Sequence, residues 1–274
     1  MAALPPNPRI IRLDVAYDGT AYAGWQVQAE GHRPTIQGTI EDKLAQLYAN
    51  QPIRIHGSGR TDAGVHALGQ VAHFQPPACP RIPLGELSRI LNGMLPADIR
   101  IRAAAPAADD FHARYSAAGK AYVYVLHRGA PDPFTERWSW RTTDCTDVAA
   151  MRRAARRLTG RHDFSSFTVA RNDIGDAERT LHRIAIQRFD ERLCLTFLGD
   201  GFLYKMVRSL TAALVEVGRG RLSPTEVTGI LAARNRAITP ATAPARGLFL
   251  AGVFYDPTVT AAFRLRRPPP WLRL

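Results

Sequence analysis

Apolar residues in the first 110 positions recur at spacings that predict alternating strands and helices. Ile11, Leu13 and Val15 alternate with other residues, which is typical of a strand with one buried face. Between residues 35 and 50 the apolar positions recur at steps of three and four, which predicts a helix with one buried side. The predicted elements follow the order strand, helix, strand, strand, helix, strand: 10–17, 35–50, 53–56, 70–74, 83–92 and 99–103.

The second half of the chain repeats this order of elements. Its predicted elements are 120–127, 147–159, 181–187, 193–198, 202–217 and 248–254. Ser223 and Glu226 form a capping box with proline at the first helical position, so a further helix is expected to start there. Two such units predict an α+β fold of two ferredoxin-like halves with antiparallel sheets. We expect the halves to be residues 1–110 and 111–274, the second with a basic, Pro-rich tail from about residue 264.

The composition favours a polyanionic partner. The chain has 274 residues and a formal net charge of +12, and all but three of its 36 basic residues are arginines. Such an excess of positive charge is typical of nucleic-acid-binding proteins, although codon bias explains part of the preference for arginine. No apolar run is long enough to span a membrane, and the start of the chain does not have the pattern of a secretory signal. Three widely spaced cysteines without zinc-ligand spacing fit a reducing cytoplasm.

A Gly-rich loop over residues 57–69 carries the candidate chemistry. It lies between two predicted strands, and its glycines allow backbone angles that other residues resist. Asp62 lies among these glycines, two residues after Arg60. A carboxylate in a closed site needs a cationic neighbour to remain ionised, so an arginine partner is expected.

Other interpretations of this loop remain open from the residues alone. A phosphate-binding loop is one, but neither the P-loop pattern nor the third glycine of the dinucleotide fingerprint is present. His56, His66 and His73 are candidate metal ligands, although no second ligand cluster accompanies them. The simplest interpretation is a hairpin turn in which Asp62 caps its own backbone.

The loop and several other segments resemble the tRNA pseudouridine synthase A family. The sequence GRTDAGVHA at residues 59–67 matches the family signature without a break. Asp200 and Ser209 stand where asparagine is common in the family, and residues 169–179 match it poorly. Otherwise the resemblance extends from about Arg9 to Tyr255, with these motifs in family order: YDGTAYAGWQ at 17–26, TIQG at 35–38, FHARYSA at 111–117, KAYVY at 120–124, LTGRHDFSSF at 158–167, GFLYKMVR at 201–208 and APARGLFL at 243–250.

The resemblance implies roles for five residues. Asp62 matches the essential aspartate of the family, and Arg208 matches the arginine that pairs with it. Tyr122 matches the tyrosine that stacks on the target uracil, and base stacking of this kind contributes about 1–3 kcal/mol. Arg60 would displace the target base or hold phosphate, and Leu248 would form a wall of the pocket. From the residues alone, an ordinary sheet residue is the better interpretation of Tyr122. A solvated loop position remains open for Arg60 and an exposed helix face for Arg208, and Leu248 could equally be a core residue.

The family reaction converts uridine to pseudouridine at positions 38, 39 and 40 in the anticodon arm of tRNA, and it needs neither a metal nor a cofactor. The resemblance therefore implies a cytoplasmic isomerase that binds tRNA as a homodimer, with its two halves flanking a basic catalytic cleft. The helix predicted at 147–159 carries four arginines that either line that cleft or form a solvated helix face: Arg152, Arg153, Arg156 and Arg157. The alternatives are a non-catalytic tRNA-binding or folding protein of the same fold, and a nucleotide- or metal-dependent enzyme that uses the loop or His162 and Asp163.

Overall fold

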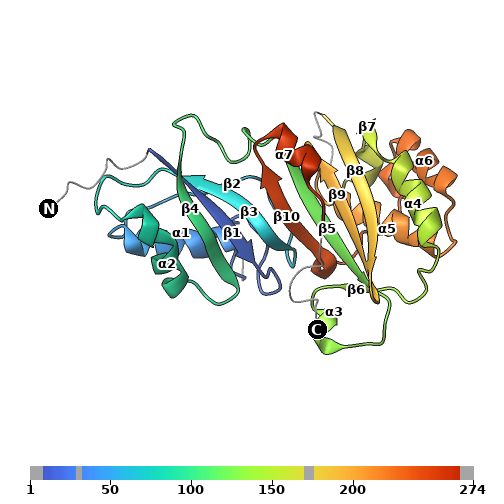
Figure 1. Cartoon of the computed structure of the whole chain (residues 1–274), viewed down its shortest axis with the longest axis horizontal. Coiled ribbons are helices and arrows are strands. Elements are labelled where there is room, and N and C mark those ends of the chain that lie inside the picture. The colour runs from blue at the N-terminus through green and yellow to red at the C-terminus, as the bar shows by residue number, and fades with distance from the viewer. Residues whose placement is uncertain (1–8, 29–32, 170–175, 266–274) are drawn as a thin grey trace. The chain divides into compact units, whose positions relative to one another are not determined.

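The chain folds into two compact units of mixed helices and strands (Figure 1). The structure is a computed structural model that describes residues 9–28, 33–169 and 176–265. One unit comprises Met1–Ala117 and Leu250–Val253, and the other comprises Ala118–Phe249 and Phe254–Leu274. The predicted α+β class is confirmed at this level, and each unit is described by itself below.

The first unit has the predicted order of elements. These are β1 (Ile10–Tyr17), α1 (Ile36–Leu47), β2 (His56–Gly57), β3 (His66–Phe74), α2 (Leu84–Met94) and β4 (Ile99–Ala107). Strand β1 lies between β4 and β3 and is antiparallel to both, while β2 pairs with β3. Helices α1 and α2 contact each other, and α2 contacts β4. The buried face predicted for the strand at 10–17 is confirmed, because Leu13 and Val15 are fully buried.

The predicted strand at 53–56 is wrong for most of its length. Only His56 and Gly57 pair with β3, although Ile53 and Ile55 are buried as expected. Two side chains of α1 form hydrogen bonds with the backbone of Ile55. The Ile55 N–H donates to Glu41 Oε1 at 2.8 Å, and the Ile55 carbonyl accepts from Gln37 Nε2 at 3.1 Å. Because these side chains satisfy the backbone groups, no strand partner is needed there. Strand β3 in turn begins at His66, four residues earlier than predicted.

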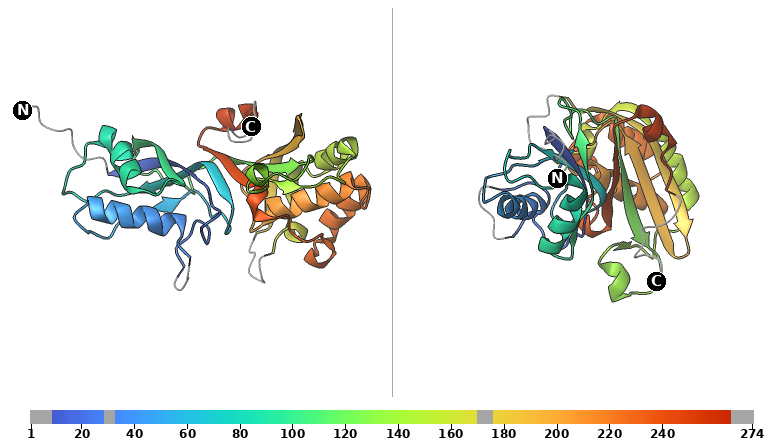
Figure 2. Two further views of the ribbon diagram at one scale, coloured as in Figure 1. Left: turned by 90° about the horizontal axis from the view of Figure 1, so that it is seen from below. Right: turned by 60° about the vertical axis from the view of Figure 1, so that its left-hand side comes forward.

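The second unit contains the predicted elements and several additional ones. Strands β5 (Gly119–His127), β9 (Arg192–Gly199), β8 (Glu178–Phe189) and β7 (Gly160–Asp163) lie side by side in that order and are antiparallel. Helix α4 (Val148–Arg157) contacts β8 and packs against α5 (Met206–Gly218) and α6 (Pro224–Ala233), while α5 also contacts β5 (Figure 2). The elements not predicted are β7, β6 (Trp140–Arg141), the short helices α3 (Pro133–Glu136) and α7 (Pro257–Ala262), and three short 3-10 helices at Ser165–Phe167, Arg236–Ile238 and Ala245–Gly247. Since β6 is parallel to β5, this sheet is not purely antiparallel.

The structure corrects the predicted start of α5, whereas the bounds of the strand predicted at 248–254 agree with the prediction. Helix α5 begins at Met206, not at residue 202, because Lys205 has a left-handed backbone conformation with φ of +57°. Strand β10 (Leu248–Phe254) has the predicted bounds, yet its central residues Leu250–Val253 belong to the first unit.

Most of the predicted basic tail lies outside the described residues. Its described beginning runs along β8, where Arg183 Nη2 donates to the Phe263 carbonyl and Gln187 Nε2 donates to the Leu265 carbonyl at 3.1 Å. Among the helices that the structure describes, none has both the length and the apolar character needed to cross a membrane.

Candidate active site

The loop that carries Asp62 is fixed at its start by a buried glutamine. Ser58 Oγ donates to Gln70 Oε1 at 2.7 Å, and Gln70 Nε2 donates to the Gly59 carbonyl at 3.0 Å. The Ser58 N–H also donates to the Val71 carbonyl at 2.7 Å. Because Ser58 and Gln70 are fully buried, these bonds are shielded from water and hold the loop against β3.

Aromatic residues of the 17–26 segment fix the centre of the loop. The Tyr17 hydroxyl lies 2.8 Å from Thr61 Oγ1, and the Trp25 N–H donates to the Thr61 carbonyl at 3.1 Å. The Val65 N–H closes a turn by donating to the Asp62 carbonyl at 3.1 Å. Burial raises the pKa of Tyr17, and hydrogen bonds with Thr61 and Gln70 oppose that rise only in part, so its hydroxyl stays protonated. Asp62 therefore sits half-buried on a turn that is held by hydrogen bonds to the backbone and side chain of Thr61 and by the bond from Val65 to Asp62.

Glycines permit the close backbone approach in this region. Gly24 has φ of +105°, and a Cβ placed on it would lie 2.6 Å from the Thr61 carbonyl oxygen. A Cβ on Gly19 would lie 2.0 Å from the Val65 carbonyl oxygen. The carbonyls of Gly24 and Trp25 also accept from the first N–H groups of α1, at 3.1 and 3.0 Å. The 17–26 segment is thus held between the start of α1 and the Asp62 loop.

His66 serves the loop as a structural residue. Its Nδ1 lies 3.0 Å from Asp18 Oδ1 and 3.1 Å from the Gly19 nitrogen, and the ring is buried. Burial on its own raises the pKa of Asp18, but hydrogen bonds from His66 and Thr20 outweigh it and hold the pKa below its usual range. The carboxylate of Asp18 consequently stays ionised and ties the end of β1 to the start of β3.

Arg60 extends from the same loop into solvent. Its side chain is exposed, and its Nε donates to Gln26 Oε1 at 3.2 Å. Arg60 and Asp62 both belong to the first unit.

The other predicted site residues belong to the second unit. Tyr122 lies on β5 with 8% of its surface exposed, and its ring meets Phe202 edge-on with centroids 5.0 Å apart. Arg208 lies in the first turn of α5, and its Nε donates to the Ala243 carbonyl at 2.7 Å. Leu248 is the first residue of β10 and is buried.

Tyr124 organises this part of the second unit, a role that sequence analysis missed. Its hydroxyl donates to the Pro244 carbonyl at 2.7 Å, and a Cβ on Gly247 would lie 2.6 Å from the Tyr124 ring. Burial raises the pKa of Tyr124, although the nearby charges of Arg208 and Arg246 oppose the rise. Residues 243–248 thus pack on Tyr124 and Arg208 together. The signal in the sequence was the period of two that places Tyr122 and Tyr124 on one face of β5.

Comparison with known proteins identifies the family. The family described as tRNA pseudouridine synthase matches residues 15–116 and 154–256. The chain belongs to the tRNA pseudouridine synthase family. The matched segments include Arg60, Asp62, Arg208 and Leu248, whereas Tyr122 lies in the interval between them.

Curated relatives of this synthase family are similar over nearly their whole length. A tRNA pseudouridine synthase A of Exiguobacterium sp. is 43% identical over 248 residues, covering 90% of this chain and 98% of the relative. The tRNA pseudouridine synthase A of Moorella thermoacetica is 45% identical over 246 residues, covering 89% and 99%. Among solved structures, a crystal structure of a Cbf5-Nop10-Gar1 complex matches with a TM-score of 0.35 and 11% identity, over 88% of this chain and 47% of that one. A likeness this distant identifies neither fold nor function.

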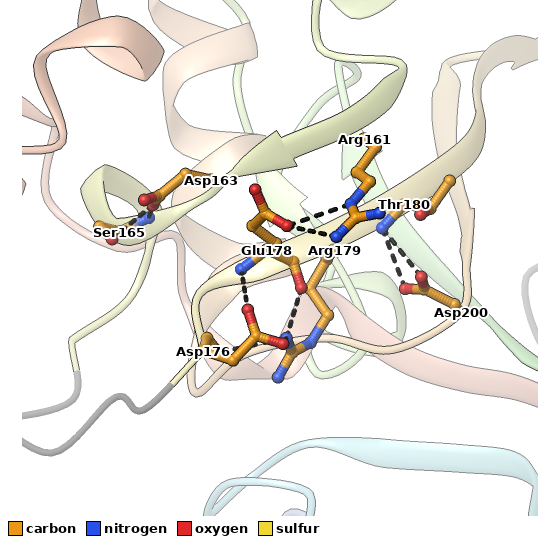
Figure 3. Close-up of polar contacts among 8 residues, drawn as sticks. All are labelled: Arg161, Asp163, Ser165, Asp176, Glu178, Arg179, Thr180 and Asp200. Carbon is orange, nitrogen blue, oxygen red and sulfur yellow. Dashed lines mark hydrogen bonds and ion pairs between the residues drawn. The ribbon is translucent and has the colours of Figure 1, made fainter.

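Polar residues around the start of β8 serve local structure in this member of the synthase family (Figure 3). Asp200, which stands where asparagine is common, accepts the Thr180 N–H with both carboxylate oxygens at 3.0 and 3.1 Å. Asp163 accepts the Ser165 N–H at 2.8 Å and lies 3.2 Å from Arg234 Nε. His162 Nε2 lies 3.1 Å from the Thr159 carbonyl oxygen. These contacts give His162 and Asp163 a structural role.

No metal centre is formed by the residues that the structure describes. Among them, no group of three or more His, Cys, Asp and Glu side chains is arranged to hold a metal ion. Of the three histidines named as candidates, His66 has its Nδ1 3.0 Å from Asp18 Oδ1, while His56 and His73 stack with ring centroids 5.2 Å apart.

Proposed function

We propose that this protein isomerises uridine to pseudouridine in the anticodon arm of tRNA, at positions 38, 39 and 40, with Asp62 as the catalytic carboxylate. Its membership of the tRNA pseudouridine synthase family supports the activity. The single observation that carries the assignment of Asp62 is its place on a turn fixed by buried hydrogen bonds from Tyr17, Trp25 and Gln70. Catalytic groups need such a rigid support.

The reaction rearranges bonds without net oxidation or reduction. The bond from C1′ of the ribose to N1 of uracil breaks, the base turns, and a bond from C1′ to C5 forms. The proton on C5 is released, and N1 takes up a proton. One carboxylate is sufficient for this chemistry, so we propose that no metal or cofactor takes part.

We propose the following roles for the other site residues. Arg208 pairs with and orients Asp62, since a bond between guanidinium and carboxylate is strong and directional. Tyr122 stacks on the target uracil, Leu248 forms a wall of the pocket, and Arg60 contacts the displaced base or a phosphate. The exposure of Arg60 and the support of Arg208 by the Ala243 carbonyl are compatible with these roles.

At the level of the whole molecule, we propose two ferredoxin-like halves, residues 1–110 and 111–274, that flank a basic catalytic cleft. The net charge of +12 supports a tRNA substrate. An enzyme of this kind would act in the cytoplasm as a homodimer that binds the anticodon stem-loop.

The proposal is tested by tritium release from tRNA labelled at C5 of uracil. Wild type should release tritium without any added nucleotide or metal and in the presence of a chelator. Asp62→Ala and Asp62→Asn should lower the rate by at least about 1000-fold, because the group that acts on the ribose or base is lost. Both variants should keep the affinity for tRNA within about threefold, because they remove no contact to phosphate. Equal activity in Asp62→Asn would remove Asp62 from the mechanism.

The second candidate, a non-catalytic tRNA-binding or folding protein, is separated by the same experiment. It predicts tight binding of tRNA by wild type and no release of tritium from any tRNA with uridines in the anticodon arm. Activity that depends on an added metal or nucleotide would instead support a nucleotide- or metal-dependent enzyme.

A further inference from the structure

Tyr115 is an exposed aromatic residue in a turn that the proposed reaction does not use. It lies in the FHARYSA segment, residues 111–117, at the end of the first unit. Its side chain is 76% exposed, the largest exposed fraction among the large apolar side chains that the structure describes. An aromatic ring so open to water calls for an explanation, because large exposed apolar groups commonly mark a contact surface.

The turn holds this ring in a fixed position. The backbone N–H groups of Arg114 and Tyr115 donate to His112 Nδ1 at 3.1 and 3.3 Å. The His112 N–H donates to Ser116 Oγ at 3.0 Å, and the Ser116 N–H donates to the His112 carbonyl at 2.9 Å. The His112 ring then lies against Tyr115, with centroids 4.4 Å apart and an angle of 33° between the planes. One side of the tyrosine is supported, while most of its surface remains open.

A second histidine anchors the turn to β3. The Ala113 N–H donates to His73 Nδ1 at 3.2 Å, and Ala113 is fully buried. The His73 ring is 4.7 Å from that of His112 and 5.9 Å from that of Phe111. Burial, together with the neighbouring His112 and His56, lowers the pKa of His73 to about 4, so Nδ1 remains a neutral acceptor at physiological pH. The support under Tyr115 is therefore rigid.

Arg114 places positive charge over the Tyr115 ring. Its side chain is exposed, and its guanidinium carbon lies 5.5 Å from the centroid of the Tyr115 ring. An open aromatic face beside an arginine matches the chemistry of a nucleotide, whose base stacks on the ring and whose phosphate binds the guanidinium. In a chain of net charge +12, an RNA is the occupant with complementary charge.

We propose that Tyr115, supported by His112 and flanked by Arg114, is a stacking platform for an unpaired base of the RNA substrate. This platform lies in residues 111–117 and not in the Asp62 loop, and the proposal rests on tRNA being the substrate, as set out above. Because every base has a π-face, stacking tolerates different sequences, so the platform would hold an RNA without selecting one base.

The test compares tRNA binding by wild type and four variants, and it maps the crosslink that wild type forms with the RNA. The affinity for an unmodified tRNA transcript is measured for wild type, Tyr115→Ala, Tyr115→Phe, Arg114→Ala and a control, Phe134→Ala. Phe134 is a matched control because it is a 70% exposed aromatic residue on α3 of the second unit. Transcripts with 5-iodouridine in place of uridine are then photo-crosslinked to wild type, and the attached residue is identified by mass spectrometry.

We expect Tyr115→Ala to weaken binding by about 5- to 150-fold, the range that the loss of one stacked base implies. Tyr115→Phe should bind like wild type because it retains the ring, and Arg114→Ala should weaken binding and reduce its dependence on salt. Phe134→Ala should have no effect, and the crosslink should map to Tyr115. Unchanged melting temperatures would show that the variants are folded.

Two results would overturn the proposal. One is equal affinity in Tyr115→Ala and Phe134→Ala. The other is a change in oligomeric state in Tyr115→Ala that accounts for all of its loss of affinity, since the ring would then be covered by a second copy of the chain. If wild type binds tRNA through Tyr115 but forms no pseudouridine, the proposed activity fails and the platform stands.

Discussion

Gly24 allows the 17–26 segment to approach the backbone of the Asp62 loop closely. Its φ of +105° disfavours any L side chain, and a Cβ would lie 2.6 Å from the Thr61 carbonyl oxygen. We expect Gly24→Ala to lower the free energy of unfolding by about 1–3 kcal/mol through backbone strain. It should also lower the rate of pseudouridine formation at least about tenfold, because Asp62 is displaced.

The matched control is Gly85→Ala in α2, where an added Cβ meets nothing within 4 Å. That variant should leave the rate unchanged and raise the free energy of unfolding by up to about 1 kcal/mol, since alanine is the better helix former. Stability is measured by urea unfolding and the rate by tritium release. Equal rates in the two variants would show that Gly24 does not position the loop.

His73 predicts a pH dependence of stability. Its pKa is lowered to about 4 in the folded chain by burial and by the neighbouring His112 and His56, against 6.5 for an ordinary histidine. Above pH 6.5 both states carry a neutral ring. As the pH falls from 6.5 towards 4, only the unfolded state takes up the proton, so this contribution to stability is lost.

Wild type should therefore lose on the order of 1–2 kcal/mol more of its free energy of unfolding than His73→Asn between pH 7 and pH 5. Asparagine retains an acceptor for the Ala113 N–H. The control, His182→Asn, removes an exposed imidazole on β8. Urea unfolding at both pH values measures the difference, and parallel losses in wild type and His73→Asn would contradict the prediction.

At the scale of elements, sequence periodicity located the helices and strands, and local hydrogen bonds decided their ends. Helix α1 ends at Leu47, short of residue 50, where Ala49 and Asn50 have positive φ. The predicted strand before β2 is largely absent, because Glu41 and Gln37 bind the backbone of Ile55. Such side chain to backbone bonds depend on tertiary contacts, which a period of two or 3.6 does not report.

For the candidate site, too, the sequence predicted one part and not the other. The signature motif located the Asp62 loop, but no local pattern predicted the hydrogen bonds by which Gln70, Tyr17 and Tyr124 support the site residues. Gln70 and Tyr124 lie on strands whose alternation predicts burial only. Their hydrogen bonds reach Gly59 and Pro244, positions that the fold alone brings close.

The capping box of α6 is an element whose contribution can be measured. Ser223 Oγ accepts the Glu226 N–H at 3.1 Å, and Glu226 Oε2 accepts the Ser223 N–H at 2.7 Å. We expect Ser223→Ala to lower the free energy of unfolding by about 1 kcal/mol, while Ser223→Asn should be close to wild type. Thermal and urea unfolding of both variants check this, and an equal loss in both would indicate that the cap is not the cause.

At the scale of the whole molecule, the net charge of +12 predicts that binding of tRNA depends steeply on salt. Phosphate contacts release counterions, so the logarithm of the affinity should fall linearly with the logarithm of the salt concentration. The exposed face of α4 offers a direct test, because Arg153 and Arg157 both point away from its buried side.

Replacing Arg153 and Arg157 together by alanine should reduce that slope by about 2 if both contact phosphate. Arg89→Ala, at an exposed arginine of α2 already paired with Glu86 at 2.6 Å, is the control and should leave the slope nearly unchanged. A flat response of wild type to salt would contradict a basic RNA-binding surface. An unchanged slope in the double variant would place that surface away from α4.

The division of β10 between the two units has a consequence for biosynthesis. The first unit ends at Ala117 except for Leu250–Val253, and β10 is the neighbour of β3 in the sheet. A ribosome that adds 5–20 residues per second needs on the order of ten seconds to pass from the one segment to the other. During that time the nascent first unit exposes the edge of β3, which is the kind of edge that recruits other strands. The first unit therefore cannot be completed until residues 250–253 have been synthesised.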